Sequence, residues 1–588
     1  MAFRKIMEQK KVDIYLVPSA DFHESEYVTE YFKAREFMTG FDGSSGTAVI
    51  TLTEAGLWTD GRYFVQAKKQ LPKAVKLYKA GEEGVPAIEE YVEQTLNENG
   101  CLGFDGRVVN SVWGEKLKNI VEKKHGKLKT DEDLIDSIWE NRPALSKEPV
   151  WILEETYSGK STADKLMDLR KEMKEQNASV HLLTSLCDIA WLLNVRGGDI
   201  SYVPVVLSYL ALTEDDCIWF LQKEVLDEKV QEYLKKNNIS VRSYETFYDY
   251  VKTLSRQTIL LDKKMISYRI LNSLDASNRI VDAMNPAALR KAVKNETEIS
   301  NIIKAHVKDA VAMCRFMYWL KKNAGSIPMT ELTVSEYLEG LRKEQKGYLG
   351  KSFETISAYG AHGAIVHYAP VPETDAVLKP QGFLLLDSGG HYLEGTTDIT
   401  RTFVLGALTG EMKTDYTLVC RANLNLAYTR FLYGCTGRNL DLAAREPLWE
   451  AGLDFKHGTG HGVGYLLNVH EGPNVFRWKT VSDERNEAVF EEGMVTTDEP
   501  GLYKEDKYGI RLENELLCKK GEKNAYGQFM YFENLTFVPF ELDAIVKEEM
   551  TEVEIKRLND YHAKVYAVVS PYLEGDELAW LKEATRAV

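Results

Sequence analysis

Two polar, proline-containing breaks divide this chain into three segments. The first break is the stretch 142–149, and the second lies at Asn285-Pro286. A chain of 588 residues is too long for one hydrophobic core and should form several. We therefore expect domains at 1–145, 150–285 and 289–588.

The first two segments have the pattern of α/β domains, because strand-like and helix-like runs alternate along each of them. The first opens with a strand-like run at 12–17. Further on, Leu52-Thr53-Glu54 follows an apolar run and precedes Trp58, and in the second segment Leu212-Thr213-Glu214 does the same before Trp219. This echo indicates two related α/β domains in tandem.

The composition is that of an ordinary globular protein and excludes several kinds of partner. Hydrophobic residues make up 44% of the chain, charged residues 28%, and the formal net charge is -16. No basic stripe stands out, which argues against nucleic acid or an anionic membrane. The seven cysteines are widely spaced without a CxxC pair, as expected in a reducing compartment. Without a signal-like start or a membrane-length apolar run, we expect a cytoplasmic protein.

The third segment concentrates imidazole groups. Six of the eleven histidines lie between His362 and His470. Among them, His457 and His461 are bracketed by glycines at 458, 460 and 462, which forbid a stable helix and let the backbone approach a ligand closely. The helical zinc-protease motif is therefore excluded, since it also needs a glutamate beside the first histidine. We expect a functional site at this loop.

Acidic residues lie upstream of this loop. The buried strand-like run 383–386 leads to Asp387, Gly389-Gly390 supplies a turn, and the chain returns through Asp398, which together predict a hairpin. Two aspartates near the ends of a hairpin can converge on one point. Taken singly, Asp387 is better explained as a strand cap and Asp398 as a solvated polar residue.

Further acidic residues lie downstream. Glu499 is expected at the tip of a strand that ends in a Pro-Gly turn. The next strand, 510–515, places Arg511, Glu513 and Glu515 on one face. A charged strand face is usually solvated, so these residues gain a function only if that face looks toward the site.

Together, the acidic residues and the glycine loop offer four carboxylates and one imidazole as metal ligands. Their formal charge balances two divalent ions, and an oxygen-rich set suits Mn²⁺ better than a structural zinc. Two ions about 3.5–4 Å apart can hold a bridging hydroxide and polarise a carbonyl, which is the chemistry of hydrolysis. The five residues are Asp387, Asp398, His461, Glu499 and Glu513.

Five stretches of the third segment carry a family resemblance. They are Leu386-Asp387-Ser388-Gly389, the runs 395–402, 457–464 and 468–473, and Asp498-Glu499-Pro500-Gly501. In order and spacing they resemble Xaa-Pro aminopeptidase (aminopeptidase P) in its long, three-domain form. The resemblance implies two creatinase-like N-terminal α/β domains followed by a C-terminal α+β "pita-bread" metallopeptidase domain.

The resemblance also implies how the metal ions are held. Asp398 and Glu513 would bridge both ions, Asp387 would complete the shell of one, and His461 with Glu499 the shell of the other. The ions would be Mn²⁺, with Zn²⁺ or Co²⁺ as alternatives.

Catalytic roles follow from the same resemblance. Glu499 would accept a proton from the bridging water and pass it to the leaving prolyl nitrogen. His367 and His470 would bind the substrate and stabilise the tetrahedral intermediate. His457 would line the pocket for the proline ring, and Arg511 would orient the metal-bound carboxylates.

Some residues depart from the family pattern or match no role in it. Leu502-Tyr503 stands where relatives often carry two aromatic residues, and the acidic stretch 482–487 looks like an insertion. Both could alter how a substrate fits. We interpret His306 as part of the face of a long amphipathic helix, and His362 and His391 as structural.

The expected function is hydrolysis of the N-terminal Xaa-Pro bond of peptides by a hydroxide that bridges two metal ions. Proline lacks an N–H and has a fixed φ, so ordinary peptidase sites reject it, whereas a site built around the ring selects it. The alternatives are a prolidase that cleaves Xaa-Pro dipeptides, a metal-free creatinase-type enzyme and an inactive scaffold. The retained ligands argue against the last two. The resemblance further implies a homodimer.

Overall fold

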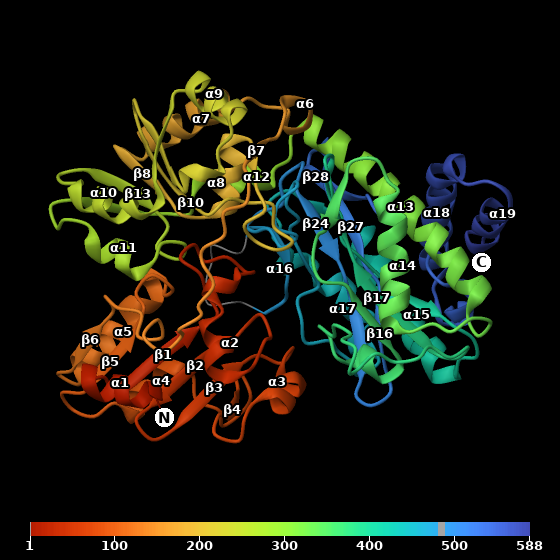
Figure 1. Cartoon of the computed structure of the whole chain (residues 1–588). Coiled ribbons are helices and arrows are strands. Elements are labelled where there is room, and N and C mark those ends of the chain that lie inside the picture. The colour runs from red at the N-terminus through yellow and green to blue at the C-terminus, as the bar shows by residue number, and fades with distance from the viewer. Residues whose placement is uncertain (1, 480–487) are drawn as a thin grey trace. The chain divides into compact units, whose positions relative to one another are not determined.

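The computed structural model describes residues 2–479 and 488–588 (Figure 1), so the acidic stretch 482–487 lies outside the described residues. By packing, the chain divides into two units. The first contains Met1–Glu155 and Lys160–Ala287, and the second contains Thr156–Gly159 and Ala288–Val588. The boundary predicted between 145 and 150 falls inside the first unit and remains a prediction.

Each half of the first unit contains a six-stranded sheet. The first sheet has the order β4-β3-β2-β1-β5-β6 and the second the order β12-β11-β10-β8-β13-β14. The strands of the first are β1 (Ile14–Pro18), β2 (Thr47–Thr51), β3 (Ala55–Thr59), β4 (Lys76–Lys79), β5 (Cys101–Phe104) and β6 (Lys127–Lys129). Those of the second are β8 (Val180–Leu183), β10 (Ser208–Thr213), β11 (Cys217–Leu221), β12 (Ile239–Ser243), β13 (Thr258–Leu261) and β14 (Arg279–Asp282).

The two sheets share their strand directions as well as their order. In each, the central strand is antiparallel to one neighbour and parallel to the other: β1 to β2 and β5, and β8 to β10 and β13. The predicted echo lies in corresponding hairpin turns, but its register is wrong by two residues, because Thr51 and not Thr53 occupies the position equivalent to Thr213. In the first turn the Thr51 hydroxyl accepts a hydrogen bond from Glu54 N at 2.8 Å, and in the second Thr213 accepts one from Asp216 N at 2.9 Å. The tandem α/β prediction is confirmed.

Helices of the second unit cover its sheets (Figure 1). They are α13 (Glu296–Asn323), α14 (Glu331–Lys343), α15 (Gly410–Ala427), α17 (Leu442–Glu450), α18 (Glu552–Val569) and α19 (Gly575–Ala584). Asn295 caps α13 by accepting from Glu298 N, and Thr551 caps α18 in the same way. Their apolar faces share one core with strand residues such as Leu384 and Leu516. The long helix and the helical C-terminal tail were both predicted correctly.

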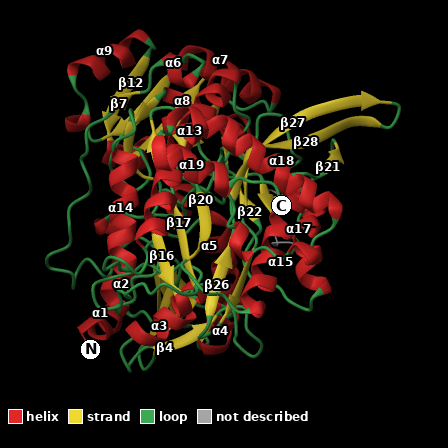
Figure 2. Cartoon of the chain, turned by 90° about the vertical axis from the view of Figure 1, so that its right-hand side faces the viewer, coloured by secondary structure: helices red, strands yellow, loops and turns green. Residues whose placement is uncertain are grey.

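The strands of this unit form several small sheets. One has the order β16-β17-β20, from β16 (Ile356–Tyr359), β17 (Phe383–Ser388) and β20 (Ile399–Val404). Another has the order β21-β28-β27-β24, from β21 (Arg430–Leu432), β24 (Val495–Asp498), β27 (Asn514–Asn524) and β28 (Gly527–Asn534). Figure 2 shows β27 and β28 as a long ribbon. Two-stranded pairs join β22 (Gly460–His461) to β23 (Val475–Phe476) and β25 (Gly501–Lys504) to β26 (Tyr508–Arg511).

Two local predictions were wrong. Gly389-Gly390 is not the turn of a simple hairpin, because Gly390 begins a further strand, β18 (Gly390–Tyr392), which turns back into β19 (Gly395–Thr396) before β20. Gly389 instead permits close packing, since a Cβ there would lie 2.0 Å from Thr397 O. The predicted strand 510–515 is interrupted at 512–513 between β26 and β27, where the chain passes from one sheet to another.

Candidate metal centre

The carboxylates and the imidazole predicted as metal ligands come from strand ends in different small sheets of the second unit. Asp387 lies in β17 opposite Thr400 of β20, and Asp398 immediately precedes β20. Glu499 follows β24, and Glu513 occupies the interruption before β27. Backbone hydrogen bonds, such as the one from Glu513 N to Thr400 O at 3.1 Å, join these strand ends.

Three of the predicted ligands meet directly. Asp398, His461 and Glu513 each offer a ligand atom, and these atoms all lie within 4.8 Å of one another. His461 Nε2 is 3.4 Å from Asp398 Oδ2 and 3.6 Å from Glu499 Oε1, so Glu499 faces the same imidazole. The fifth residue, Asp387, is buried and close enough to Asp398 for its charge to act on the Asp387 carboxyl.

The glycines around His461 permit a close approach of backbone segments. A Cβ at Gly460 would lie 1.8 Å from Thr497 O, and one at Gly462 would lie 2.1 Å from Glu471 O. This packing lets His461 N donate to Thr497 Oγ1 at 3.0 Å. A side chain at Gly460 would displace the strand that leads to Glu499, and one at Gly462 would displace the backbone at Glu471.

A hydrogen bond to the backbone fixes the orientation and the tautomer of the His461 ring. Nδ1 lies 2.9 Å from Gly462 O, which can only accept, so Nδ1 carries a proton and donates it. Nε2 therefore faces the carboxylates. Burial alone would lower the pKa of His461, but Asp398 and Glu499 outweigh burial and raise the pKa to about 9. An imidazole oriented by a backbone carbonyl is a usual arrangement for a metal ligand.

The carboxylates lie in an environment that disfavours their ionised form. Burial and the charges of Asp398 and Asp387 raise the pKa of Glu513 well above its usual range. Burial also raises the pKa of Glu499, although His461 opposes this shift. Such groups hold protons until a cation replaces them.

The donor set fits divalent ions. Asp387 Oδ2 accepts from Arg511 Nη2 at 2.6 Å, whereas Asp387 Oδ1 is buried and has no hydrogen-bond partner among residues 2–479 and 488–588. An orphaned carboxylate oxygen beside further carboxylates and one imidazole is the kind of oxygen-rich set that hard divalent cations prefer. The residues present can therefore hold the predicted ions.

A chain of hydrogen bonds runs from Asp387 to His457. Arg511 Nη1 donates to the hydroxyl oxygen of Tyr503 at 2.8 Å, and that hydroxyl lies 2.8 Å from His457 Nε2. Because His457 Nδ1 donates to Gly458 O at 2.7 Å, a neutral ring accepts at Nε2 from Tyr503. Burial and the charge of Arg511 lower the pKa of His457 to about 3, which keeps this ring neutral.

His470 and His367 are the two histidines predicted to bind the substrate. His470 is half-buried and lies against His461, with ring centroids 4.3 Å apart. His367 is also half-buried, and the carbonyl of the preceding Val366 accepts from Arg511 Nη2 at 3.4 Å. Arg511 therefore contacts the segment that carries His367 as well as Asp387.

Sequence reasoning missed a buried pair behind the site. Glu515 Oε1 accepts from Asp398 N at 2.7 Å and lies 3.1 Å from His306 Nε2. His306 was expected only to form part of a helix face, but its side chain pairs with Glu515. The alternation that placed Arg511 and Glu513 on one face also included Glu515, so the signal was present, but its partner on α13 was not identifiable from spacing.

Other histidines and hydroxyl groups support neighbouring structure. His362 Nδ1 lies 2.8 Å from Glu331 Oε1, and His391 Nδ1 lies 3.0 Å from Thr396 Oγ1, which agrees with their interpretation as structural. Thr400 Oγ1 donates to Glu513 Oε2 at 2.8 Å. This threonine was not predicted as part of the site, and Tyr503 was singled out only as a departure that could alter how a substrate fits.

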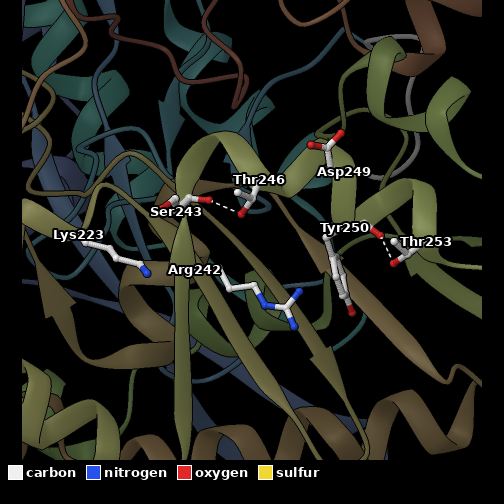
Figure 3. Close-up of a pocket in the computed structure, with 7 residues that line it drawn as sticks. All are labelled: Lys223, Arg242, Ser243, Thr246, Asp249, Tyr250 and Thr253. Atoms are coloured by element: carbon white, nitrogen blue, oxygen red, sulfur yellow. Dashed lines mark hydrogen bonds between the residues drawn. The ribbon is translucent and has the colours of Figure 1, made fainter.

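A surface pocket in the first unit contains none of the predicted site residues (Figure 3). It has a volume of about 430 Å³ and is lined by Lys223, Arg242, Ser243, Thr246, Asp249, Tyr250 and Thr253. Two of its hydroxyl groups are bonded locally, from Thr246 to Ser243 O at 2.6 Å and from Thr253 to Tyr250 O at 2.7 Å. This pocket is open to solvent and lacks the buried cluster of carboxylates and imidazole that lies in the second unit.

Family models match along the chain. A creatinase/prolidase N-terminal domain matches residues 1–138, and a second model of that description matches 141–298. Metallopeptidase family M24 matches 300–520, and the C-terminal region of peptidase M24 matches 528–588. With the carboxylate–imidazole cluster, these matches define a pita-bread metallopeptidase preceded by two creatinase-type domains.

Individual relatives narrow the class. Xaa-Pro aminopeptidase 1 of Dictyostelium discoideum is 37% identical, with 98% of this chain and 94% of the relative covered. Aminopeptidase P1 of Arabidopsis thaliana is 35% identical, with coverages of 98% and 97%. The crystal structure of X-prolyl aminopeptidase from Caenorhabditis elegans, described as a cytosolic enzyme with a dinuclear active site, has a TM-score of 0.93 and 34% identity, with coverages of 98% and 95%. The chain belongs to the Xaa-Pro aminopeptidase family.

Among the described residues, no helix combines the length and the apolar character needed to cross a membrane.

Divalent metal should stabilise the folded protein more strongly as pH rises. Above about pH 4 an unfolded chain has lost the protons that the raised carboxylates of the folded, metal-free protein still hold, so stability of the metal-free fold falls with pH. The raised pKa of His461 acts in the same direction, because the stability that its charge contributes is lost as pH rises through about 9. Bound ions replace these protons.

Differential scanning calorimetry of metal-loaded and chelated protein measures this effect. We expect the difference in Tm between the two samples to widen by about 2 °C or more between pH 6 and pH 8.5, since about 1 kcal/mol shifts Tm by about 2–4 °C in domains of 150–250 residues and by less in larger ones. A Tm difference that stays constant or narrows with rising pH would contradict the protonation states described above.

Proposed function

We propose that this chain is a metal-dependent aminopeptidase that removes the first residue from peptides whose second residue is proline. The observation that carries the proposal is the convergence of Asp398, His461 and Glu513 in the unit that also contains the neutral His457. The relatives named Xaa-Pro aminopeptidase, matched over nearly the whole chain, support the choice of substrate.

We assign two divalent ions, Mn²⁺ with Zn²⁺ or Co²⁺ as alternatives, to the five predicted ligands. Asp398 and Glu513 would contact both ions, Asp387 one of them, and His461 with Glu499 the other. When bound, the ions supply Lewis-acid polarisation of the scissile carbonyl and lower the pKa of a water molecule. The oxygen-rich donor set and the dinuclear site described for the Caenorhabditis elegans relative support this assignment.

The chain's own groups move the protons. Glu499 accepts a proton from the water that attacks the scissile carbonyl carbon and transfers it to the prolyl nitrogen as the C–N bond breaks. His470 and His367 bind the substrate and donate hydrogen bonds to the oxygen on which negative charge develops. Arg511 holds Asp387 in place through the 2.6 Å contact.

His457 contributes to selection of the proline ring. Burial and the charge of Arg511 keep its imidazole neutral, so that Nε2 accepts from Tyr503, and the ring lies 4.9 Å from the Phe455 ring, measured between centroids. A neutral, aromatic-backed surface suits an apolar ring better than a charged one does. The assignment also includes a cytoplasmic homodimer and domain boundaries at 1–145, 150–285 and 289–588, which rest on family likeness and on the breaks in the sequence.

The test is an assay after chelation, with each metal added back to separate samples. We expect Mn²⁺ to restore the most activity, and a Xaa-Pro-Xaa tripeptide to be cleaved with a kcat/KM about tenfold or more above that of the matching Xaa-Pro dipeptide and of a Xaa-Ala-Xaa tripeptide. Preference for the dipeptide would favour a prolidase. Failure to take up any divalent metal would favour the inactive scaffold.

A further inference from the structure

Arg445, on α17, is a buried arginine whose entire hydrogen-bonding capacity is used. Its side chain is 1% exposed. Nε donates to Asp441 Oδ2 at 2.7 Å, Nη1 to Asp454 Oδ1 at 2.7 Å and Phe455 O at 2.8 Å, and Nη2 to His457 O at 2.9 Å and Thr459 Oγ1 at 3.4 Å. A guanidinium has five N–H donors, and all five have acceptors here.

Four of these five acceptors belong to the segment 454–459. This segment has no helix or strand of its own and leads directly into β22, where His461 lies. The guanidinium carbon of Arg445 is also 3.9 Å from the centroid of the Phe455 ring. One side chain thus holds the segment through its backbone, two side-chain oxygens and a ring.

The held segment carries His457 between two fixed points. On one side, Arg445 donates to the His457 carbonyl oxygen, and the Phe455 ring contacts both the guanidinium of Arg445 and the imidazole of His457. On the other side, Tyr503 donates to His457 Nε2 and accepts from Arg511, which holds Asp387. The position of the imidazole relative to the carboxylates therefore depends on both anchors.

We propose that Arg445 is a positioning residue that sets the location of His457 and thereby the width of the pocket for the proline ring. This inference rests on the proposed function, because the pocket is defined by that function. Arg445 acts through the segment 454–459 and does not itself touch the substrate or the ions.

Lysine cannot take the place of this arginine. An ammonium group has three donors on a single nitrogen, whereas the acceptors around Arg445 are spread over Asp441 and the segment 454–459 in an arrangement that needs a planar fork. Arg445→Lys keeps the charge opposite Asp441 and loses part of the contacts to the segment. Asp454→Ala provides a milder variant, since the Asp454 side chain is 41% exposed and its loss leaves the other four contacts intact.

Steady-state kinetics with a Xaa-Pro-Xaa tripeptide tests the proposal. We expect Arg445→Lys to raise KM by about tenfold with a smaller change in kcat, and Asp454→Ala to raise KM by about threefold, as the loss of an interaction that positions the substrate predicts. Metal content per chain should equal that of the wild type in both. Arg438→Lys, an exposed arginine of the neighbouring helix α16 (Gly437–Leu440), is the matched control and should leave KM within about twofold.

A double-mutant cycle separates positioning from general damage. If Arg445 acts through His457, Arg445→Lys combined with His457→Ala should raise KM no further than His457→Ala alone. Additive effects, or a loss of kcat and metal with KM unchanged, would overturn the proposal. If Arg445→Lys fails to fold, the same cycle with Asp454→Ala in its place tests whether the contact of Arg445 to the segment acts through His457.

Crystal structures of the variants provide a readout that needs no activity. We expect the segment 454–459 to be displaced while Asp398, His461 and Glu513 keep their positions. An undisplaced segment with a wild-type KM would refute positioning and leave the proposed function intact. If the wild-type protein cleaves no Xaa-Pro-Xaa peptide, the proposed function fails, and the crystal structures still decide whether Arg445 positions His457.

Discussion

Replacing His461 by alanine is expected to remove metal from the protein and to lower kcat/KM by about 100-fold or more, beyond the 10–100-fold typical of losing a residue that merely supports a ligand. His461 is the single imidazole in the proposed ligand set, and its Nε2 lies 3.4 Å from Asp398 Oδ2 and 3.6 Å from Glu499 Oε1. Without the ring, the carboxylates are left to hold the ions alone. Metal per chain, measured after exhaustive dialysis, reports the loss directly.

Two further histidine variants serve as the comparison and the control for His461→Ala. His367→Ala should keep the full metal content and slow turnover, because His367 is assigned to the substrate and not to the ions. His125→Asn should change neither quantity, since His125 is exposed in the first unit and asparagine tolerates its left-handed backbone, with φ of 51°. A His461→Ala protein with wild-type activity would contradict the ligand assignment.

Three of the candidate ligands, His461, Asp387 and Glu499, lie in stretches whose local sequence indicates their backbone conformation. The glycines beside His461 excluded a helix, the apolar run 383–386 indicated a buried strand ending at Asp387, and the Pro-Gly pair placed Glu499 at a strand end. Local rules of this kind state what a segment can do. Their convergence on one point is a tertiary fact. The charge balance of the set suggested that convergence, and the family resemblance supplied the role of each ligand.

The tandem organisation of the first unit was predictable for a different reason. Alternating strand-like and helix-like runs indicated α/β domains, whereas the three-residue echo located the two turns but paired Thr53 with Thr213, where the structure pairs Thr51 with Thr213. By contrast, the excursion through β18 and β19 was missed, since the glycines at 389 and 390 suit a tight turn as well as close packing.

Specific side-chain contacts, whether between distant or nearby segments, could not be predicted from the sequence. The pairs His306 with Glu515 and Arg445 with the segment 454–459 join residues whose types are compatible with many surroundings. From the sequence alone, an arginine on a short helix is expected at the surface, because arginine is rarely buried unless its donors have acceptors. The supporting residues of a site are therefore harder to predict than the residues that face the ligand.

Replacing Glu499 by glutamine is expected to lower kcat by about 100- to 10,000-fold, the contribution usual for a general base. Glutamine keeps the shape of the side chain and one oxygen beside His461 and Thr497, but it cannot accept the proton of the attacking water. Because a neutral amide is also a weaker ligand, metal content must be measured and kinetics taken at saturating Mn²⁺. Glu505→Gln, an exposed neighbour on the loop between β25 and β26, is the matched control and should be unchanged.

The pH profile then separates the two roles assigned to Glu499. If the carboxylate is the base, the residual activity of Glu499→Gln at saturating metal should lose the acidic limb of the wild-type kcat profile, because the base whose protonation causes that limb has been removed. A variant that is slow only when metal is limiting, and that recovers wild-type kcat at saturation, would show Glu499 to be a ligand and not the base. The proton would then have to be accepted elsewhere, and His470, which lies against His461, is the next group to test.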